Sequence, residues 1–179
     1  DLFALSRAEV EQLALKCVPL NAGSVIDHVV ETAAEIGWRI NKVEVIAQVT
    51  DDLPPMLADE SRLEQVLRNL IHNALRHTAP GGLVIVSADE AAGRMRIQVR
   101  DTGEGIAPED LPHIWDRYFR SQPNGGTGIG LTLVKSFVEA MNGQVAVEST
   151  PGEGACFTLY LPLSADSIPI AAPVKTPVP

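Results

Sequence analysis

Residues 101–131 of the chain read DTGEGIAPEDLPHIWDRYFRSQPNGGTGIGL, and this stretch decides the fold. It holds two glycine-rich turns, at residues 101–106 and 125–131; a strand-like segment precedes the first turn, and a helix follows the second. Glycine lets the backbone approach a ligand closely, and a glycine-rich loop that opens a helix presents free N–H groups that suit phosphate. Two such loops, the first headed by a carboxylate, indicate a nucleotide site with a base end and a phosphate end.

The composition is that of one acidic globular domain. The chain has 179 residues, of which 45% are hydrophobic, so we expect a single domain with its own core. Its net charge of −9 argues against binding to nucleic acid, which requires broad positive charge, but leaves room for one nucleotide. No apolar run approaches the ~18 residues of a membrane span, so we expect no direct membrane contact from this chain.

The cysteines bear on the cellular location of the protein, and the first residue bears on whether the chain is a fragment. Cys17 and Cys156 fit no metal-ligand spacing and indicate reduced thiols in a cytoplasmic protein. Because the chain begins at Asp1 rather than Met, we expect a fragment, whose parent could be anchored in the inner membrane by a segment outside this sequence.

Hydrophobic periodicity predicts helices interspersed with short strands. Residues 1–16 form either a short terminal helix or the end of a longer one, and a break at residues 19–23 precedes a helix over 25–37 that Ser24 caps. A long helix capped by Asp59 or Ser61 ends before residues 80–82, and a helix over 129–141 ends at Asn142-Gly143 in a way that fits a left-handed C-cap. The predicted strands span residues 43–49, 56–58, 83–88, 94–100, 144–149 and 155–161.

This order of elements predicts an α+β fold. We expect a two-layer α/β sandwich, with helices on one face of a mixed, mostly antiparallel sheet. Neither glycine turn lies in a strand–turn–helix unit with a parallel return strand, which argues against a doubly wound fold. The expected divisions are a helix end over residues 1–18, one domain over 19–163, and a disordered tail or linker over 164–179, which is rich in Pro and Ala.

The long helix carries a polar stripe that two readings explain. Asn69, Asn73 and His77 are four residues apart and lie on one side of the helix, beside its apolar stripe. Asparagine is an indifferent helix former, so two of them one turn apart require a reason. The stripe is either a solvated polar face or a set of amide oxygens that ligate a hard cation such as Mg²⁺, with Arg76 reaching phosphate.

Five motifs in order resemble those of a known family. NLIHNALRH (69–77), DTGEGI (101–106), IWDRYFR (114–120), GTGIGL (126–131) and PGEG (151–154) resemble the N box, first glycine box, F box, second glycine box and closing turn of one domain. That domain is the catalytic and ATP-binding domain of sensor histidine kinases, within the superfamily that includes the gyrase, Hsp90 and MutL ATPases. The resemblance covers residues 20–162 and implies the Bergerat-type ATP-binding fold.

The resemblance implies a role for each motif residue in binding ATP and Mg²⁺. Asp101 accepts a hydrogen bond from the adenine amino group, and Asn73 ligates Mg²⁺ with Asn69 supporting that shell. A carboxylate that reads an amino group favours adenine over guanine, whose carbonyl would leave it unpaired. The remaining nucleotide contacts implied by the resemblance come from Arg76, His77, Gly103, Gly105, Ile106, Gly126, Thr127, Gly128, Ile129, Gly130 and Leu131.

The chemistry implied by the resemblance is transfer rather than hydrolysis. Related ATPases carry a water-activating glutamate where this chain has Asn69, and an amide is not a general base; Glu64 lies off the stripe and is expected at the surface. Catalysis then rests on positioning and charge neutralisation. Arg117 either stabilises the γ-phosphate during transfer or forms a surface salt bridge, and residues 121–125 with the F box form a lid that orders on binding.

The resemblance also implies partners. The first residues resemble the end of the second helix of a dimerisation and phosphoacceptor domain, whose substrate histidine is absent from this chain. The leading hypothesis is a kinase module that phosphorylates that histidine, which then phosphorylates a response regulator; the parent is expected to be a homodimer. The alternatives are a catalytically silent ATP-responsive interaction module and a serine kinase of the anti-sigma type.

Overall fold

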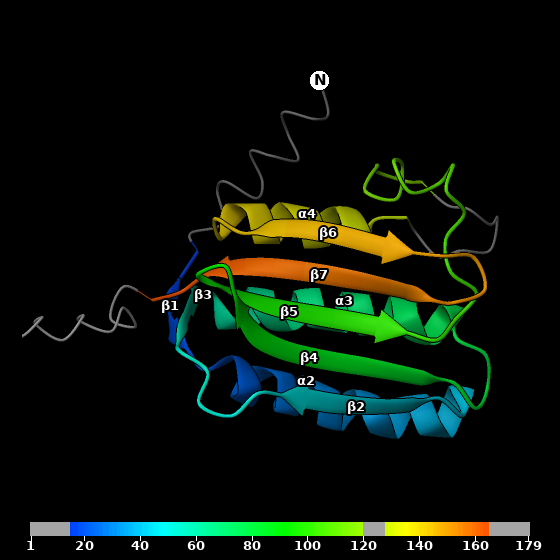
Figure 1. Ribbon diagram of the computed structural model, residues 1–179, viewed down its shortest axis with the longest axis horizontal. Helices are drawn as coiled ribbons and strands as arrows, with labels where there is room; N and C mark the ends of the chain where they lie inside the picture. Colours follow the sequence, from blue (N-terminus) through cyan, green and yellow to red (C-terminus); the bar gives the residue numbers. More distant parts are fainter. Residues whose placement is uncertain (1–14, 120–127, 165–179) are drawn as a thin grey trace, which may run out of the picture.

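A computed structural model describes residues 15–119 and 128–164 of the chain. Within these residues, one sheet has the strand order β2-β4-β5-β7-β6 (Figure 1). Strands β2 and β4 are parallel, and every other neighbouring pair is antiparallel. The strands are β2 (Glu44–Val49), β4 (Leu83–Ala91), β5 (Arg94–Asp101), β6 (Gln144–Ser149) and β7 (Ala155–Pro162).

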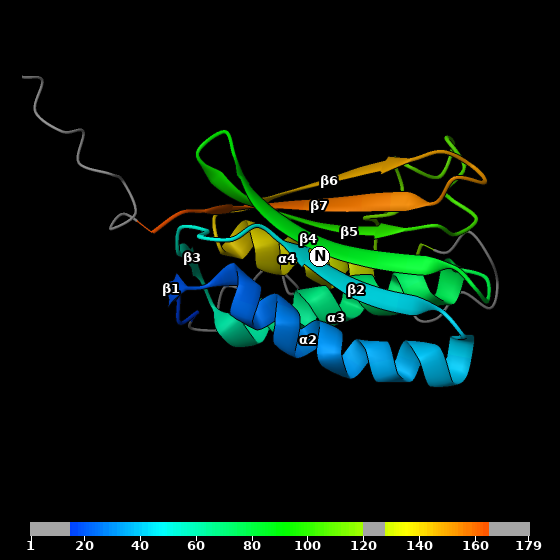
Figure 2. The same cartoon turned by 60° about the horizontal axis from the view of Figure 1, so that its bottom comes forward.

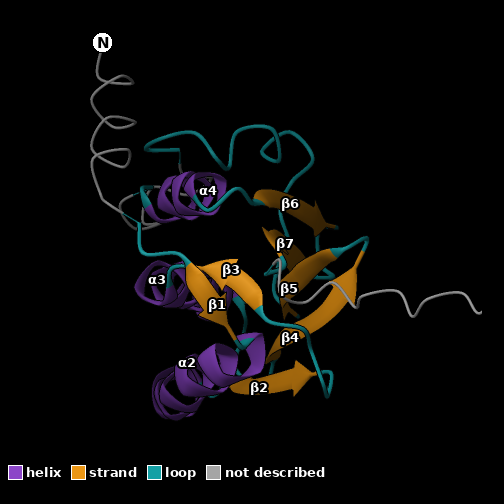
Figure 3. Ribbon diagram, turned by 90° about the vertical axis from the view of Figure 1, so that its left-hand side faces the viewer, coloured by secondary structure: helices purple, strands orange, loops and turns teal. Residues whose placement is uncertain are grey.

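Helices cover one face of this sheet. Figures 2 and 3 show α2 (Ala22–Ile36), α3 (Glu60–His77) and α4 (Gly130–Ala140) side by side beneath the strands. The core lies between the two layers, where fully buried side chains from the helices meet those from the strands. The largest of them include Ile26, Leu63, Leu67, Leu70, Met95, Ile97, Phe157, Leu159 and Leu161. The predicted two-layer α+β sandwich with a mixed sheet is therefore confirmed.

The N-terminal part of the described chain departs from the sequence prediction. Residues 15–17 are not helical, and the break expected at Pro19 is instead strand β1 (Val18–Leu20), antiparallel to β3 (Met56–Ala58). A three-residue strand containing proline gives no alternation to detect. The cap of α2 is Asn21 rather than Ser24: the Asn21 Oδ1 accepts a hydrogen bond from the Ser24 backbone N–H at 3.0 Å, so the helix begins three residues early.

A π-helical turn, η1 (Gly37–Asn41), extends α2 beyond its predicted end. Gly37 is buried, and a Cβ placed on it would lie 3.0 Å from a Leu75 methyl group and 3.1 Å from the Val43 carbonyl oxygen. Lys42, with φ of +56°, ends the turn, and the Asn41 side-chain amide donates to the Leu75 carbonyl at 2.7 Å. Close packing against α3, rather than a chain reversal, is thus the reason for this glycine.

One edge of the sandwich collects the ends of several elements. Strand β5 ends there at Asp101, α3 ends at His77, α4 begins at Gly130, and β6 and β7 meet in a turn over residues 150–154 (Figure 1, right-hand side). The first glycine-rich motif and residues 128–131 of the second lie at this edge. Among the described residues, no helix is both long and apolar enough to cross a membrane.

Candidate nucleotide-binding site

The polar stripe of α3 reaches this edge. Of the two predicted caps, Asp59 is the one used: its Oδ1 accepts from the Arg62 backbone N–H at 3.1 Å. The leucine face of the helix packs on the sheet, and Asn69, Asn73 and His77 lie half-buried beside that face. The Asn69 Nδ2 is buried without a hydrogen-bond partner among the described residues. A buried orphan amide is costly, so its presence favours a ligand at this stripe.

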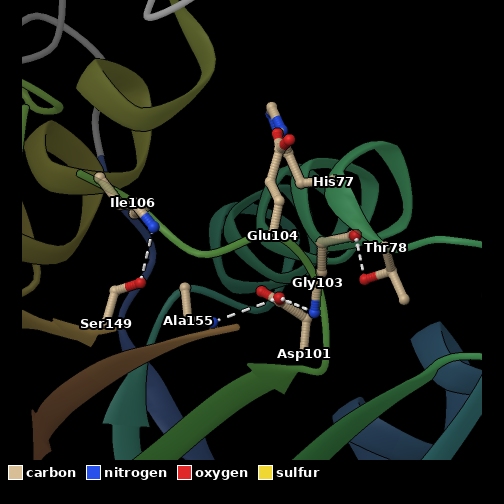
Figure 4. Close-up of polar contacts among 9 residues, drawn as sticks. His77, Thr78, Asp101, Gly103, Glu104, Ile106, Ser149 and Ala155 are labelled. Carbon is tan, nitrogen blue, oxygen red and sulfur yellow. Dashed lines mark hydrogen bonds and ion pairs between the residues drawn. The ribbon is translucent and has the colours of Figure 1, made fainter. Parts of the chain in front are cut away.

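Asp101 lies at the floor of the site. Its side chain is 5% exposed, and its Oδ1 accepts hydrogen bonds from the backbone N–H groups of Gly103 at 2.9 Å and Ala155 at 3.2 Å (Figure 4). Its Oδ2 has no donor among the described residues. Burial raises the pKa of this carboxyl above its ordinary value, while the two backbone bonds and the nearby His77 oppose that rise. Such a perturbed carboxylate with one unused acceptor is suited to reading a donor group on a ligand.

The closing turn clamps the first glycine turn from the other side. The Gly152 N–H donates to the Glu104 carbonyl at 2.7 Å. Gly105 has φ of +73°, and a Cβ placed on it would lie 2.2 Å from the Thr150 carbonyl oxygen. Both glycine positions in the first turn are therefore required by contact with protein backbone as well as by any ligand, a reason that the motif alone does not reveal.

Ser149 joins the same two turns and was not predicted as a site residue. Its hydroxyl donates to the Gly154 carbonyl at 2.7 Å and accepts from the Ile106 N–H at 2.9 Å (Figure 4). The sequence held a weak signal for it. Along β6 the inward-facing positions are Val145, Val147 and Ser149, so the last is a hydroxyl at a position where alternation calls for an apolar side chain.

Ser149→Ala is expected to lower the free energy of unfolding by about 1–3 kcal/mol, because it leaves the Ile106 N–H and the Gly154 carbonyl without their partner. Denaturant unfolding measures this change. The matched control is Ser87→Ala, on a half-buried strand position of β4 far from the turns. If the two substitutions cost the same, the hydroxyl bridge contributes nothing specific to the site.

The end of α3 contacts the first glycine turn directly. Where the helix ends, the Thr78 hydroxyl donates to the Ala74 carbonyl at 2.7 Å. The carbonyl of His77, the last residue of α3, accepts from the Glu104 backbone N–H at 3.1 Å. The His77 Nδ1 also lies 2.7 Å from the Glu104 Oε1. These contacts fix the helix end and the turn as one unit beside Asp101.

The second glycine turn meets the opposite end of the stripe. A Cβ placed on Gly130, the first residue of α4, would lie 3.9 Å from the Asn69 Oδ1. No side chain of the described residues caps α4, and the start of a helix presents backbone N–H groups that suit an anion. Asn69 and His77 are eight residues apart, about 12 Å along the helix axis. The stripe is thus bracketed by one glycine turn at each end.

The other predicted residues have mixed outcomes. Ile106, Gly128, Ile129 and Leu131 lie at the same edge, half-buried, whereas Arg76 is exposed on the last turn of α3. Arg117 is exposed, and its guanidinium carbon lies 5.4 Å from the centre of the Tyr118 ring. Gly126, Thr127 and the lid over residues 121–125 lie outside the described residues. Glu64 is off the stripe, as expected, and pairs with Arg68 at 3.2 Å.

Comparison with known proteins agrees with this geometry. The family model of histidine kinase-, DNA gyrase B- and HSP90-like ATPases matches residues 58–165. The sensor protein DivL of Caulobacter vibrioides is 36% identical over 162 residues, which are 90% of this chain and 21% of DivL. The sensor histidine kinase ZraS of Escherichia coli O157:H7 is 37% identical over 152 residues, 85% of this chain and 32% of ZraS. The chain thus spans about a fifth to a third of the length of these relatives.

Solved structures share the fold. Full-length ShkA in complex with AMPPNP superposes with a TM-score of 0.79 at 31% identity, covering 90% of this chain and 34% of ShkA. The catalytic domain of histidine kinase ThkA, at 23% identity, shows the fold alone, with a TM-score of 0.74 and coverage of 86% of this chain and 99% of that domain. The chain belongs to the family of histidine kinase-, DNA gyrase B- and HSP90-like ATPases, and its fold is that of the ATP-binding catalytic domain of sensor histidine kinases.

Proposed function

We propose that this domain binds ATP with Mg²⁺ and transfers the γ-phosphoryl group to a histidine on a dimerisation and phosphoacceptor domain. The observation that carries the proposal is Asp101, a buried carboxylate whose Oδ1 is held by two backbone N–H groups while Oδ2 has no donor among the described residues. That oxygen is the natural acceptor for the adenine amino group. The first glycine turn, which contains Gly103 and Gly105, is assigned to the base. Gly128 and Gly130 are assigned to phosphate, and the space at Gly130 is open, because only the Asn69 Oδ1 lies within 4 Å of a Cβ placed there.

The α3 stripe is assigned to the metal and phosphate end. Amide oxygens suit Mg²⁺, which keeps several waters and binds through few protein ligands plus phosphate. Asn73 supplies the protein ligand, and the buried Asn69 amide supports the shell and faces the start of α4. Mg²⁺, when bound, would neutralise phosphate charge. Arg76 and the backbone N–H groups at the start of α4 add positive potential of their own, and His77 adds a ring nitrogen at the same stripe.

Asn73→Ala is expected to remove most of the Mg²⁺ dependence of nucleotide affinity, because the remaining contacts to the base do not involve the cation. Titration calorimetry with a non-hydrolysable ATP analogue, with and without Mg²⁺, measures this effect. Asn41→Ala, which removes an amide from η1 on another side of α3, is the control and should leave the Mg²⁺ dependence intact. Equal Mg²⁺ dependence in wild type and Asn73→Ala would remove Asn73 from the metal shell.

Transfer to histidine is favoured over hydrolysis by the chemistry of the stripe. Asn69 cannot take a proton from water, so the domain is expected to hydrolyse ATP slowly and to act through positioning. We assign to Arg117, which is exposed beside Tyr118, the role of stabilising the γ-phosphate in the transfer state. Transfer of labelled phosphate to a separately supplied phosphoacceptor domain tests the proposal, and failure of transfer with ATP binding intact would leave an ATP-responsive interaction module.

The wider setting is proposed from the relatives. DivL and ZraS are named as sensor proteins, so the parent of this domain is placed in a two-component pathway with a response regulator as the final acceptor. We assign the domain itself to residues 19–163, with residues 1–18 leading from the dimerisation helices of a homodimer. The free thiols of Cys17 and Cys156 agree with a cytoplasmic location.

A further inference from the structure

Glu104 makes two contacts with one residue of the α3 stripe. Its Oε1 lies 2.7 Å from the His77 Nδ1, and its backbone N–H donates to the His77 carbonyl at 3.1 Å (Figure 4). Gly103 makes this approach possible, because a Cβ there would lie 2.3 Å from the His77 carbonyl oxygen. The side-chain pair is therefore set by the backbone of the first glycine turn, only three residues after Asp101.

A stabilising role does not account for the side-chain pair. The His77 side chain is 28% exposed and that of Glu104 is 52% exposed. Ion pairs at this level of exposure contribute little to folding, and the backbone contacts already join the two segments. A carboxylate beside a region suited to anionic phosphates would also repel them unless a cation lay between. The arrangement calls for a functional explanation.

The contact fixes the roles of the two ring nitrogens of His77. A carboxylate accepts hydrogen bonds but does not donate them, so Nδ1 carries the hydrogen and Nε2 is the nitrogen left for another partner. Donation from Nε2 to a phosphate oxygen requires the ring form in which both nitrogens carry hydrogen. In that form Glu104 holds Nδ1–H, and Nε2–H is left to donate to the ligand.

We propose that Glu104 is a positioning residue for phosphate recognition, holding the His77 ring so that Nε2 meets a phosphate oxygen of the bound nucleotide. This inference rests on the proposed function, since it requires the phosphates to lie along the α3 stripe. It assigns Glu104 to the phosphate end of the site although it belongs to the turn that reads the base. The pair thereby links Asp101, at the base end, to the stripe of Asn69, Asn73 and His77.

The test compares a nucleotide with its base alone. Calorimetry is carried out with a non-hydrolysable ATP analogue plus Mg²⁺ and, separately, with adenosine, on wild type, Glu104→Ala and Glu104→Gln. We expect Glu104→Ala to weaken binding of the analogue about tenfold, the scale of one charge-assisted hydrogen bond, and to leave adenosine within about twofold. Glu104→Gln keeps an acceptor oxygen and should recover part of the loss. The control is Glu109→Ala, an exposed charge in the loop that follows.

Two further readouts separate positioning from mere folding. In the background of His77→Ala, the Glu104→Ala substitution should have no additional effect, because the two residues act as one unit. Nitrogen NMR of the His77 ring should show hydrogen on Nδ1 in the free wild type and a change at Nε2 when the analogue binds. Thermal unfolding confirms that each variant is folded.

The outcomes distinguish this inference from the proposed function. If the wild type binds the analogue but Glu104→Ala changes nothing, or weakens adenosine and the analogue equally, the positioning role is wrong and the proposed function stands. If Glu104→Ala tightens binding of the analogue, Glu104 opposes the phosphates and the inference is overturned. If a folded wild type binds neither ligand, the proposed function is wrong and the positioning role falls with it.

Discussion

Asp101→Asn is expected to weaken binding of the ATP analogue at least about 30-fold while leaving the free domain at least as stable as the wild type. The loss follows from the two orientations that the asparagine amide can take. In one, its NH₂ group faces the amino group of adenine, which is also a donor; in the other, its oxygen accepts the hydrogen bond but carries no charge. Removing a charged, buried partner in this way costs about 2–4 kcal/mol, which corresponds to roughly 30- to 1,000-fold in affinity.

The unchanged or raised stability follows from the direction of the pKa shift. Because burial raises the pKa of Asp101, the folded chain holds its proton up to a higher pH than the unfolded chain does. Above that pH the buried charge lowers the free energy of unfolding, and the penalty disappears as the pH falls through the raised pKa. Asparagine carries no such charge, and its side-chain oxygen can still accept from the N–H groups of Gly103 and Ala155.

Calorimetry and thermal unfolding on the same samples measure both halves of this expectation, with exposed Asp51→Asn as the charge-matched control. Wild-type affinity should also fall at acid pH, beginning at a higher pH than for an ordinary aspartate, and this dependence should be absent in Asp101→Asn. Retained affinity in a folded Asp101→Asn would place the base elsewhere. Lost affinity together with lost stability would make Asp101 a structural residue.

The sequence could predict those features that depend on local pattern or on motif order. The long amphipathic helix, the strands of the five-stranded sheet and a left-handed helix end at Asn142-Gly143 were all within reach of periodicity and turn chemistry. The structure shows that Asn142 is the left-handed residue there, with φ of +58°. The sheet order was not within reach, because the parallel pairing of β2 with β4 and the insertion of β7 between β5 and β6 depend on contacts distant in sequence. Strand β1 was missed for a similar reason, since its partner β3 lies about 40 residues away.

The sequence could predict which residues belong to the site better than it could predict the contacts between them. Asp101, Asn69, Asn73 and His77 stand out by spacing and chemistry. Glu104 and Ser149 do not, because one lies between two glycines of a turn and the other at the end of a strand. Each contacts residues far along the chain, and those contacts give it its role. Residues that position other residues are hard to recognise in a single sequence. Their role depends on which residue lies next to them in the fold, and not on a residue type that marks a particular chemistry.

Gly154→Ala is expected to be the most damaging small substitution in the closing turn, and Gly152→Ala supplies its matched control. The two glycines have almost the same backbone angle, with φ of +85° and +83°. They differ in space: a Cβ on Gly154 would lie 2.0 Å from the Asp101 carbonyl oxygen, whereas nothing lies within 4 Å of a Cβ on Gly152. Any difference between the two variants therefore measures the close approach and not the left-handed conformation.

Gly152→Ala should lower the free energy of unfolding by about 1 kcal/mol, the usual cost of alanine at positive φ. Gly154→Ala should lower it by about 3 kcal/mol or more, because the backbone at Asp101 or the turn itself must move, and the melting temperature should fall by about 6–12 °C. Since that movement displaces the Asp101 carboxylate from Gly103 and Ala155, nucleotide affinity should fall in Gly154→Ala and remain near wild type in Gly152→Ala. Equal effects of the two substitutions would show that the closing turn can change its conformation without moving Asp101. The contact between the closing turn and the first glycine turn would then not be what positions Asp101.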